Sequence, residues 1–293
     1  MKAELICSCG CTIGEGPVWD GNSDKLYFID NREWKLYCWN GMEIEGRRSF
    51  PKQLGFVVLR EKGGFVAGLK DGWYSFSDLE GGELCFLKSP EPGRSDGRFN
   101  DGKVDPAGRV WGGTQTTHLD TGEGEVLPNS GLYSLDADHQ VKRVLDGVIQ
   151  GNGMGWSADA KKFYFIDTER YCVQEFDYDI RRNELSHGRV CVTVPREEGI
   201  PDGMTVDDDG NIWVALWGGW CVNKYDPKTG ILLDRAEVPV PNVTSCCFGG
   251  RALDELYITT AAFGTDLVAH PQAGGLFRVR PGVTGRPSYP FKG

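Results

Sequence analysis

Short apolar runs alternate with turn residues along the whole chain. Six segments share one pattern, in which turn-forming residues lead into an apolar run; they cover 21–30, 61–69, 105–114, 157–167, 208–216 and 251–260. Runs of this length between turn signals predict β-strands. No window combines helical periodicity with capping residues, so helices are expected only as short connections.

The six segments recur at a loosely kept period. Aligned on Leu26, Phe65, Val110, Phe163, Ile212 and Leu256, they lie 39, 45, 53, 49 and 44 residues apart. A period of about 49 residues suits a four-stranded blade, and closing six blades into a ring leaves no long exposed sheet edge. The repeat therefore predicts an all-β fold in which 1–293 form a single six-bladed β-propeller domain. A β-sandwich, which also has short strands and turns, is the alternative.

Composition and charge narrow the function. The chain has 41 Gly and 15 Pro residues, too many for a helical protein, and its 40% hydrophobic residues are enough for a substantial core. Its formal net charge of −10 argues against a nucleic-acid or anionic-membrane partner, because both are bound through clustered Lys and Arg. A small neutral or metal-associated substrate fits this charge better. We expect a monomer or a weak homo-oligomer.

The N-terminal segment and the cysteines favour a cytoplasmic protein. No apolar run is long enough for a signal-peptide core or a membrane span. The ten cysteines are therefore expected to be reduced, buried thiols. Cys7, Cys9 and Cys11 lack the spacing of a zinc hairpin, so a cysteine-zinc site is disfavoured. Cys246 and Cys247 fall in the sixth unit's inner strand, where we expect them to pack.

Four units carry a polar residue at one repeat position. Glu15, Asn100, Asn152 and Asp202 each stand ten or eleven residues before the reference position of their unit. Equivalent residues on the first strand of each blade converge on a propeller's axis. Turn-favouring Asn and Asp residues are the alternative explanation. However, Glu15 has little turn propensity, and four units in register favour a shared central site.

These side chains offer only oxygen ligands. Carboxylate and amide oxygens without His or Cys describe a site for a divalent cation, such as Ca²⁺, Mg²⁺ or Mn²⁺, with Zn²⁺ and Fe²⁺ as alternatives. Glu15 and Asp202 together carry a charge that one divalent ion cancels, whereas the two unpaired carboxylates would be costly to bury. The sequence therefore predicts one divalent metal ion at the centre of the propeller.

Several short segments of the sequence resemble those of a known family. They are GEGPVW (14–19), RFNDGKVDPAGRVWGGT (98–114), GNGMGWSAD (151–159), PDGMTVDDDGNIWVALWGG (201–219), SCCFGG (245–250) and AGGLFRV (273–279). With these words the chain resembles the regucalcin/gluconolactonase family, also called the senescence marker protein family, of six-bladed propellers. The likeness runs in order through nearly the whole chain.

The resemblance implies a metal-dependent sugar lactonase of carbohydrate catabolism, which hydrolyses an aldono-lactone to its aldonic acid. It implies that Glu15, Asn152 and Asp202 bind the metal, and that Arg98 and Asn100 hold the sugar lactone. A further substrate-contacting position, acidic in some family members, falls on His118 if no gap intervenes. A histidine in place of an acidic residue at this position bears on which sugar is bound.

A mechanism follows from these assignments. The metal would polarise the lactone carbonyl and lower the pKa of a bound water. Asp202 would act as general base, while Arg98 and Asn100 orient the substrate and stabilise charge on the carbonyl oxygen. Trp217 either closes the pocket mouth over a sugar face or packs in the core, and His118 lies in a predicted loop over 115–130, where solvent exposure is the alternative.

Other functions compete with this interpretation. A serine hydrolase would also open a lactone, but no G-x-S-x-G word occurs. A non-catalytic calcium-binding propeller would need the metal ligands alone, and the presence of Arg98 and Asn100 argues against it. If Arg98 stood alone, a surface or inter-blade salt-bridge role would be favoured for it. A lactonase that acts on a substituted or non-sugar lactone or ester is a further alternative.

Overall fold

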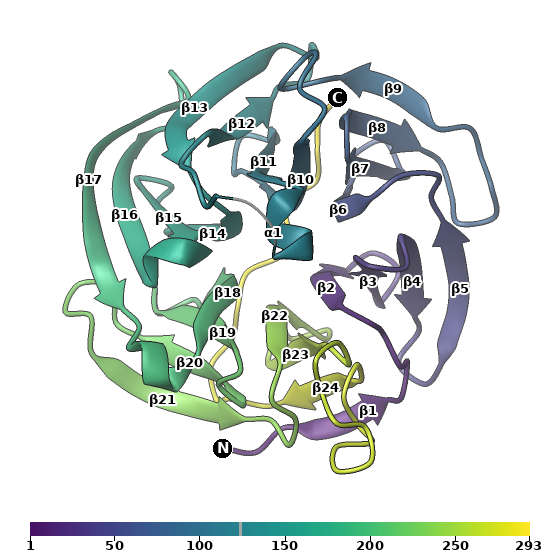
Figure 1. Cartoon of the computed structure of the whole chain (residues 1–293), viewed down its shortest axis with the longest axis vertical. Coiled ribbons are helices and arrows are strands. Elements are labelled where there is room, and N and C mark those ends of the chain that lie inside the picture. Colours follow the sequence, from purple (N-terminus) through teal and green to yellow (C-terminus); the bar gives the residue numbers. More distant parts are fainter. Residues whose placement is uncertain (123–124) are drawn as a thin grey trace.

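Each of the six repeats forms a four-stranded antiparallel sheet, and the six sheets surround one axis (Figure 1). The computed structural model describes residues 1–122 and 125–293. We call the sheets blades and number them from the one that begins at Gly14. The six-bladed propeller predicted from the repeat is confirmed.

The strands of blades 1 to 3 follow one another along the chain. Blade 1 consists of β2 (Gly14–Asp20), β3 (Lys25–Asp30), β4 (Lys35–Trp39) and β5 (Ile44–Ser49). Blade 2 consists of β6 (Leu54–Leu59), β7 (Phe65–Leu69), β8 (Gly72–Phe76) and β9 (Cys85–Lys88). Blade 3 consists of β10 (Gly97–Val104), β11 (Val110–Thr116), β12 (Ser130–Leu135) and β13 (Val141–Val148).

Blades 4 to 6 continue the ring. Blade 4 consists of β14 (Gly151–Trp156), β15 (Lys162–Asp167), β16 (Cys172–Asp179) and β17 (Glu184–Thr193). Blade 5 consists of β18 (Ile200–Val206), β19 (Ile212–Trp217), β20 (Cys221–Tyr225) and β21 (Leu232–Glu237). Blade 6 consists of β22 (Val243–Gly249), β23 (Glu255–Thr260), β24 (Leu276–Val279) and the N-terminal β1 (Glu4–Cys7). In each blade the first strand named lies nearest the axis (Figure 1).

The N-terminal strand closes the ring. β1 pairs antiparallel with β24, with Glu4 opposite Arg278 and Leu5 opposite Phe277. The outer strand of blade 6 thus comes from the start of the chain, and its other three strands come from the end. This pairing covers the outer edge that β24 would otherwise expose.

Aspartates in the turn segments hold the hairpins that follow two of the inner strands, β10 and β18. Asp105 accepts hydrogen bonds from the backbone N–H of Arg109 (2.8 Å) and from Nε1 of Trp111 (3.2 Å). Asp207 does the same with the backbone of Asn211 (2.8 Å) and with Nε1 of Trp213 (3.0 Å). In each of these two units, one buried carboxylate therefore holds both its turn and the tryptophan of the next strand.

In the described parts of the chain, helices are limited to three short segments, as predicted. α1 (His118–Thr121) lies over the axis at one end of the propeller (Figure 1), and two single-turn 3₁₀ helices are η1 (Thr168–Arg170) and η2 (Arg196–Glu198). α1 falls within the predicted 115–130 loop, whose residues 123–124 lie outside the described residues. Among the described helices, none is long and apolar enough to cross a membrane.

The cysteines match their prediction in part. All ten are free thiols, and seven are buried. Cys246 and Cys247 pack in β22, as expected. The prediction of burial is wrong for Cys85, which is exposed on the outer strand β9, and for Cys7 and Cys9, which are half-buried where β1 leaves the sheet.

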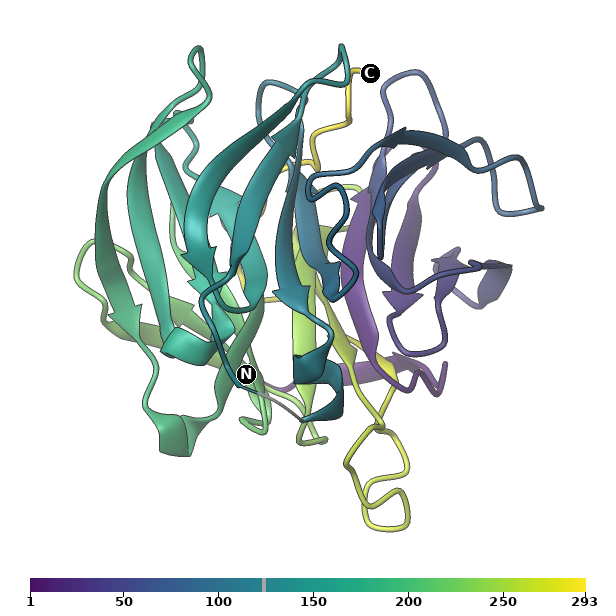
Figure 2. The ribbon, with the colours of Figure 1, turned by 45° about the horizontal axis from the view of Figure 1, so that its top comes forward.

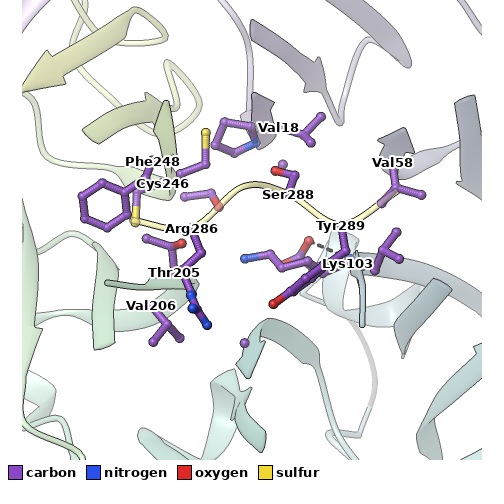
Figure 3. A pocket seen from close by; sticks show the side chains of 18 of the residues that line it. Val18, Val58, Lys103, Thr205, Val206, Cys246, Phe248, Arg286, Ser288 and Tyr289 are labelled. Carbon is purple, nitrogen blue, oxygen red and sulfur yellow. Dashed lines mark hydrogen bonds between the residues drawn. The ribbon is translucent and has the colours of Figure 1, made fainter. Parts of the chain in front are cut away.

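The C-terminal segment closes the other end of the axis. Residues 280–293 cross from blade 5 to blades 2 and 3, where the backbone N–H of Phe291 donates to the carbonyl of Leu59 (2.8 Å). On the way, Arg286, Ser288 and Tyr289 cover a cavity that also contacts Lys103 (Figure 3). In Figure 2 the yellow C-terminal end of this segment lies at the end of the propeller opposite to the short helix α1. Phe291 is fully buried in the core cluster between blades 2 and 3.

Replacing Phe291 tests how firmly this closure is held. We expect Phe291→Ala to lower the free energy of unfolding by about 3–5 kcal/mol, the usual cost of emptying a buried aromatic site. Urea unfolding followed by tryptophan fluorescence measures the change. Val268→Ala, at a side chain that is 94% exposed, is the control and should change stability by less than ~0.5 kcal/mol. Equal stability of the two variants would contradict a packed C-terminal segment.

Candidate functional site

Four inner strands bring the predicted polar residues to one end of the axis. Glu15 on β2, Asn100 on β10, Asn152 on β14 and Asp202 on β18 line a single cavity of about 250 Å³. Arg98, two residues before Asn100, lines the same cavity. The repeat position identified in the sequence therefore corresponds to one place in space.

Glycines next to these residues allow the strands to meet. A Cβ atom on Gly153 would lie 2.6 Å from the backbone nitrogen of Met204 and 2.7 Å from the carbonyl oxygen of Asp202. Real Cβ atoms do not approach backbone atoms so closely, so only glycine lets β14 pack against β18 at this point. Asn152 and Asp202 are thereby brought within hydrogen-bonding distance of each other.

Asn152 is held in one orientation by its neighbours. The hydroxyl of Thr168 donates its hydrogen to the carbonyl of Pro201 (3.0 Å), so it can only accept from Nδ2 of Asn152 (3.0 Å). Nδ2 also donates to Oδ1 of Asp202 (2.5 Å). Both amide hydrogens are therefore used, and the amide oxygen of Asn152 has no hydrogen-bond donor within the described part of the chain. This oxygen is free to bind a cation.

The carboxylates of Glu15 and Asp202 repel each other. Burial raises the pKa of Glu15 well above its usual value, and the charges of Asp202 and Asp101 raise it further. Burial also raises the pKa of Asp202, and the hydrogen bond from Asn152 only partly offsets this. Two desolvated carboxylates and an oriented amide oxygen form a donor set that fits a divalent cation. Glu15, Asn152 and Asp202 would be the residues that bind this cation.

Asp101 is a third buried carboxylate, which the sequence analysis passed over. Its Oδ1 accepts from the backbone N–H of Gly102 (2.6 Å), and it lines the cavity at the opposite end of the axis with Lys103 (Figure 3). Burial raises its pKa, while the charge of Lys103 acts in the other direction. Its place in the word RFND, directly after Asn100, was the signal available in the sequence.

Arg98 and Asp120 form an ion pair on the cavity wall. Arg98 donates from Nε to Oδ2 (2.8 Å) and from Nη2 to Oδ1 (2.5 Å) of Asp120, and both side chains are largely buried. Gln115 and Gln53 donate to the same carboxylate (3.1 and 3.3 Å). Arg98 also donates from Nη1 to Oδ1 of Asn100 (3.2 Å). Arg98 is thus a salt-bridge residue that also lines the cavity, and its contact with a substrate stays a prediction.

His118 is not brought to the cavity. Its side chain is exposed at the start of α1, and it is absent from the residues that line the site. Asp120, two residues later, points to Arg98 instead. Residues two apart on a helix face different directions, so α1 can turn only one of them inward. Sequence reasoning missed Asp120 because it placed the acidic position by counting without a gap.

Trp217 stands at the end of β19, where it lines the cavity and is partly exposed. This corresponds to the pocket-mouth position rather than to a core position. No three His, Cys, Asp or Glu side chains of the described residues form a group that could hold a metal ion. The candidate site therefore depends on amide oxygen as well as on carboxylates.

Comparison with known proteins identifies the family. The profile of the SMP-30/gluconolactonase/LRE-like region matches residues 13–262. The chain belongs to this family. Regucalcin from Sus scrofa is 39% identical over 298 residues, which cover 100% of this chain and 99% of the relative. Regucalcin from Homo sapiens is 38% identical over 299 residues with the same coverage. The resemblance seen in the sequence words is confirmed.

Solved structures agree with this membership. A luciferin-regenerating enzyme superposes with a TM-score of 0.91 at 33% identity, covering 99% of both chains. A calcium-binding regucalcin from Agrobacterium tumefaciens gives 0.89 at 24% identity, covering 99% of this chain and 97% of that one. A gluconolactonase from Xanthomonas campestris gives 0.75 at 20% identity, covering 94% and 89%. The last two likenesses bear on the fold alone.

The orientation of Asn152 by Thr168 can be tested in this SMP-30/gluconolactonase/LRE-like protein. Thr168→Val keeps the shape of the side chain but removes the hydroxyl, so the amide is free to rotate. We expect the affinity for Ca²⁺ or Mn²⁺ to fall by about 10–100-fold, as is usual when the partner of a metal ligand is lost. Calorimetric titration of chelator-treated protein measures this. Thr168→Ser should retain the wild-type affinity, and equal affinities for all three proteins would show that the hydroxyl has no such role.

The raised pKa of Glu15 has a consequence for stability. A carboxyl whose folded-state pKa lies above its unfolded value destabilises the fold as pH rises above the unfolded pKa. In chelator, Glu15→Gln should therefore raise Tm at pH 8 by about 2–4 °C, which corresponds to ~1 kcal/mol in a protein of this size. The gain should shrink toward pH 5.

Thermal unfolding followed by circular dichroism at several pH values measures this difference. Glu197→Gln, at an exposed position, is the matched control and should leave Tm nearly unchanged. A Glu15→Gln protein that is less stable than wild type at pH 8 in chelator would contradict the proposed repulsion.

Proposed function

We propose that this chain hydrolyses a sugar lactone to the corresponding aldonic acid, with one divalent cation bound by Glu15, Asn152 and Asp202. The observation that carries the proposal is that Arg98 and Asn100 line the same cavity as these three residues. A protein that only bound a cation would not need an oriented arginine and amide beside it. Family membership, and relatives named gluconolactonase, support this activity.

Asp202 is the residue we assign as general base. When bound, a divalent cation supplies Lewis acidity for the lactone carbonyl. Oδ1 of Asp202 accepts the hydrogen bond from Asn152, while its Oδ2 has no hydrogen-bond donor within the described residues. Asp202 is partly exposed to the cavity. One carboxylate oxygen is thus available to take the proton of the attacking water.

Asn100 and Asp120 are the groups we assign to the sugar. Asn100 donates from Nδ2 to the carbonyl of Gly151 (3.1 Å) and accepts from Arg98, so its amide is held from both sides. Asp120 is fixed by Arg98 and two glutamines and lies on the cavity wall. A fixed carboxylate and amide suit the hydroxyl groups of a sugar ring. Asp120 would thereby take the role that the sequence analysis gave to His118.

A calcium-binding propeller without catalysis is the second candidate. It is favoured by the relatives named regucalcin, one of which is described as a calcium-binding protein. Ca²⁺, Mg²⁺, Mn²⁺, Zn²⁺ and Fe²⁺ all suit the oxygen donors to some degree. We therefore propose a divalent cation without choosing among these five ions. A cytoplasmic location and a monomeric or weakly associated state stay predictions.

Turnover of a lactone panel separates the two candidates. Acid release from five- and six-carbon sugar lactones should occur with metal, disappear after complete chelation, and return on adding back one of the five ions. Metal binding without turnover of any lactone would favour the calcium-binding protein. Turnover that survives complete chelation would overturn the role of the metal.

Asp202→Asn should lower kcat by about 10²–10⁴-fold, the usual contribution of a general base. The exposed Asp209→Asn is the control and should keep wild-type turnover. Circular dichroism should show the same fold for both variants. Near-normal turnover in Asp202→Asn would remove Asp202 from the role of base.

A further inference from the structure

Arg32 is held at the cavity rim by a buried turn. Asp30, which is 1% exposed, accepts backbone hydrogen bonds from Arg32 (3.1 Å) and from Glu33 (3.2 Å). The same carboxylate accepts from the backbone of Thr12 (2.8 Å) and Ile13 (3.2 Å), just before the inner strand that carries Glu15. The backbone of Arg32 is therefore fixed relative to the candidate metal ligands.

The side chain of Arg32 is placed as firmly as its backbone. Its guanidinium lies over the ring of Phe263, 5.1 Å from the centroid, and Nη2 donates to the backbone carbonyl of Asp120 (2.8 Å). Phe263 is itself anchored, because its N–H donates to the carbonyl of Thr12 (2.9 Å) and its carbonyl accepts from Asn242 (2.8 Å). A guanidinium has five N–H donors, so most of those of Arg32 are left for a ligand.

Among the described residues, no side chain neutralises the charge of Arg32. Arg98, the other arginine of the cavity, is paired with Asp120. Arg32 has no carboxylate oxygen within 4 Å in the part of the chain that the structure describes, and its two contacts are a carbonyl and an aromatic face. Glu169 also lines the cavity, from η1, which follows β15 in blade 4, and blade 4 lies across the axis from blade 1 (Figure 1). Arg32 thus places an unpaired positive charge on the blade 1 side of the cavity, and Glu169 places a negative charge across from it, while the carboxylate of Glu15, also on blade 1, belongs to the proposed cation site.

We propose that Arg32, stacked on Phe263, binds a carboxylate substituent of the lactone, so that the preferred substrates are lactones of sugar diacids. One carboxyl group of such a molecule forms the lactone, and the other is the free carboxylate that Arg32 would bind. A planar guanidinium matches a carboxylate in a two-point contact, and Glu169 repels a carboxylate placed the other way round. This inference rests on the proposed lactonase function and names its substrate class.

The test compares a neutral and a charged lactone. We expect kcat/KM for D-glucaro-1,4-lactone, which carries one carboxylate, to exceed that for D-glucono-1,5-lactone at low ionic strength. The preference should diminish as salt is added, because the charges are near the surface. Arg32→Gln should reduce the ratio of the two kcat/KM values at least tenfold, and Arg32→Lys should reduce it less. A ratio that Arg32→Gln leaves unchanged would overturn the proposal.

A phosphorylated lactone distinguishes the kind of anion. If 6-phosphoglucono-1,5-lactone is preferred over the glucaro-lactone and loses this preference in Arg32→Gln, Arg32 binds a phosphate and the assignment to diacids is wrong. Arg47→Gln is the matched control, because Arg47 is exposed and lies over an aromatic ring, that of Tyr37, outside the cavity. This control should leave the ratio at the wild-type value.

A binding measurement separates failure of this inference from failure of the lactonase function. Glucarate should bind to the metal-loaded protein about tenfold more tightly than gluconate by calorimetry, and the difference should vanish in Arg32→Gln. If no lactone is hydrolysed but this difference is found, the site binds diacids and only the lactonase function fails. Equal binding of the two acids would overturn the role of Arg32, whatever the activity.

Discussion

The inner strands of neighbouring blades approach so closely that a Cβ atom on Gly55 or Gly153 would lie 2.6 Å from backbone atoms of the next blade. Glycine at these positions is what allows six strands to meet around one axis. The same approach places side chains from separate blades within bonding distance, as Asn152 and Asp202 are. It also removes water from two carboxylates, which raises their pKa values. The candidate site is therefore a direct consequence of how tightly the ring closes.

A buried pair of carboxylates is a poor way to stabilise a fold, and its presence argues for function. Elsewhere in the protein, buried carboxylates have partners. Asp105 and Asp207 each hold a turn and a tryptophan, and Asp30 holds four backbone N–H groups. Glu15 accepts only from the N–H of Gly16 (2.9 Å) within the described residues. Asp101 also accepts from a single backbone N–H, that of Gly102, but it lines the other cavity beside Lys103. In the candidate site, Glu15 is therefore a carboxylate that needs a ligand from outside the chain.

We call the residues on the inner strands the floor of the cavity and those on the connections between strands its walls. The sequence predicted which residues form the floor better than which form the walls, for a physical reason. Glu15, Asn100, Asn152 and Asp202 occupy one repeat position, and the propeller's symmetry converts equal positions in the chain into neighbouring positions in space. Thr168 and Asp120 lie on η1 and α1, the connections between strands, which follow no repeat. Counting residues along the sequence therefore pointed to His118. In the structure, α1 is oriented so that Asp120 pairs with Arg98 on the cavity wall.

This division between floor and walls bears on how such a protein acquires its specificity. The inner strands are constrained by close packing on both sides, so their polar residues can change little without opening the ring. The connections that carry Arg32, Asp120 and Phe263 lie at the end of the propeller, outside the close packing of the inner strands, and are held by hydrogen bonds and a cation–π contact instead. Proteins that share this fold carry names as different as regucalcin, gluconolactonase and luciferin-regenerating enzyme. Connections outside the close packing would let such proteins differ in the molecule that they bind while the inner strands keep their packing.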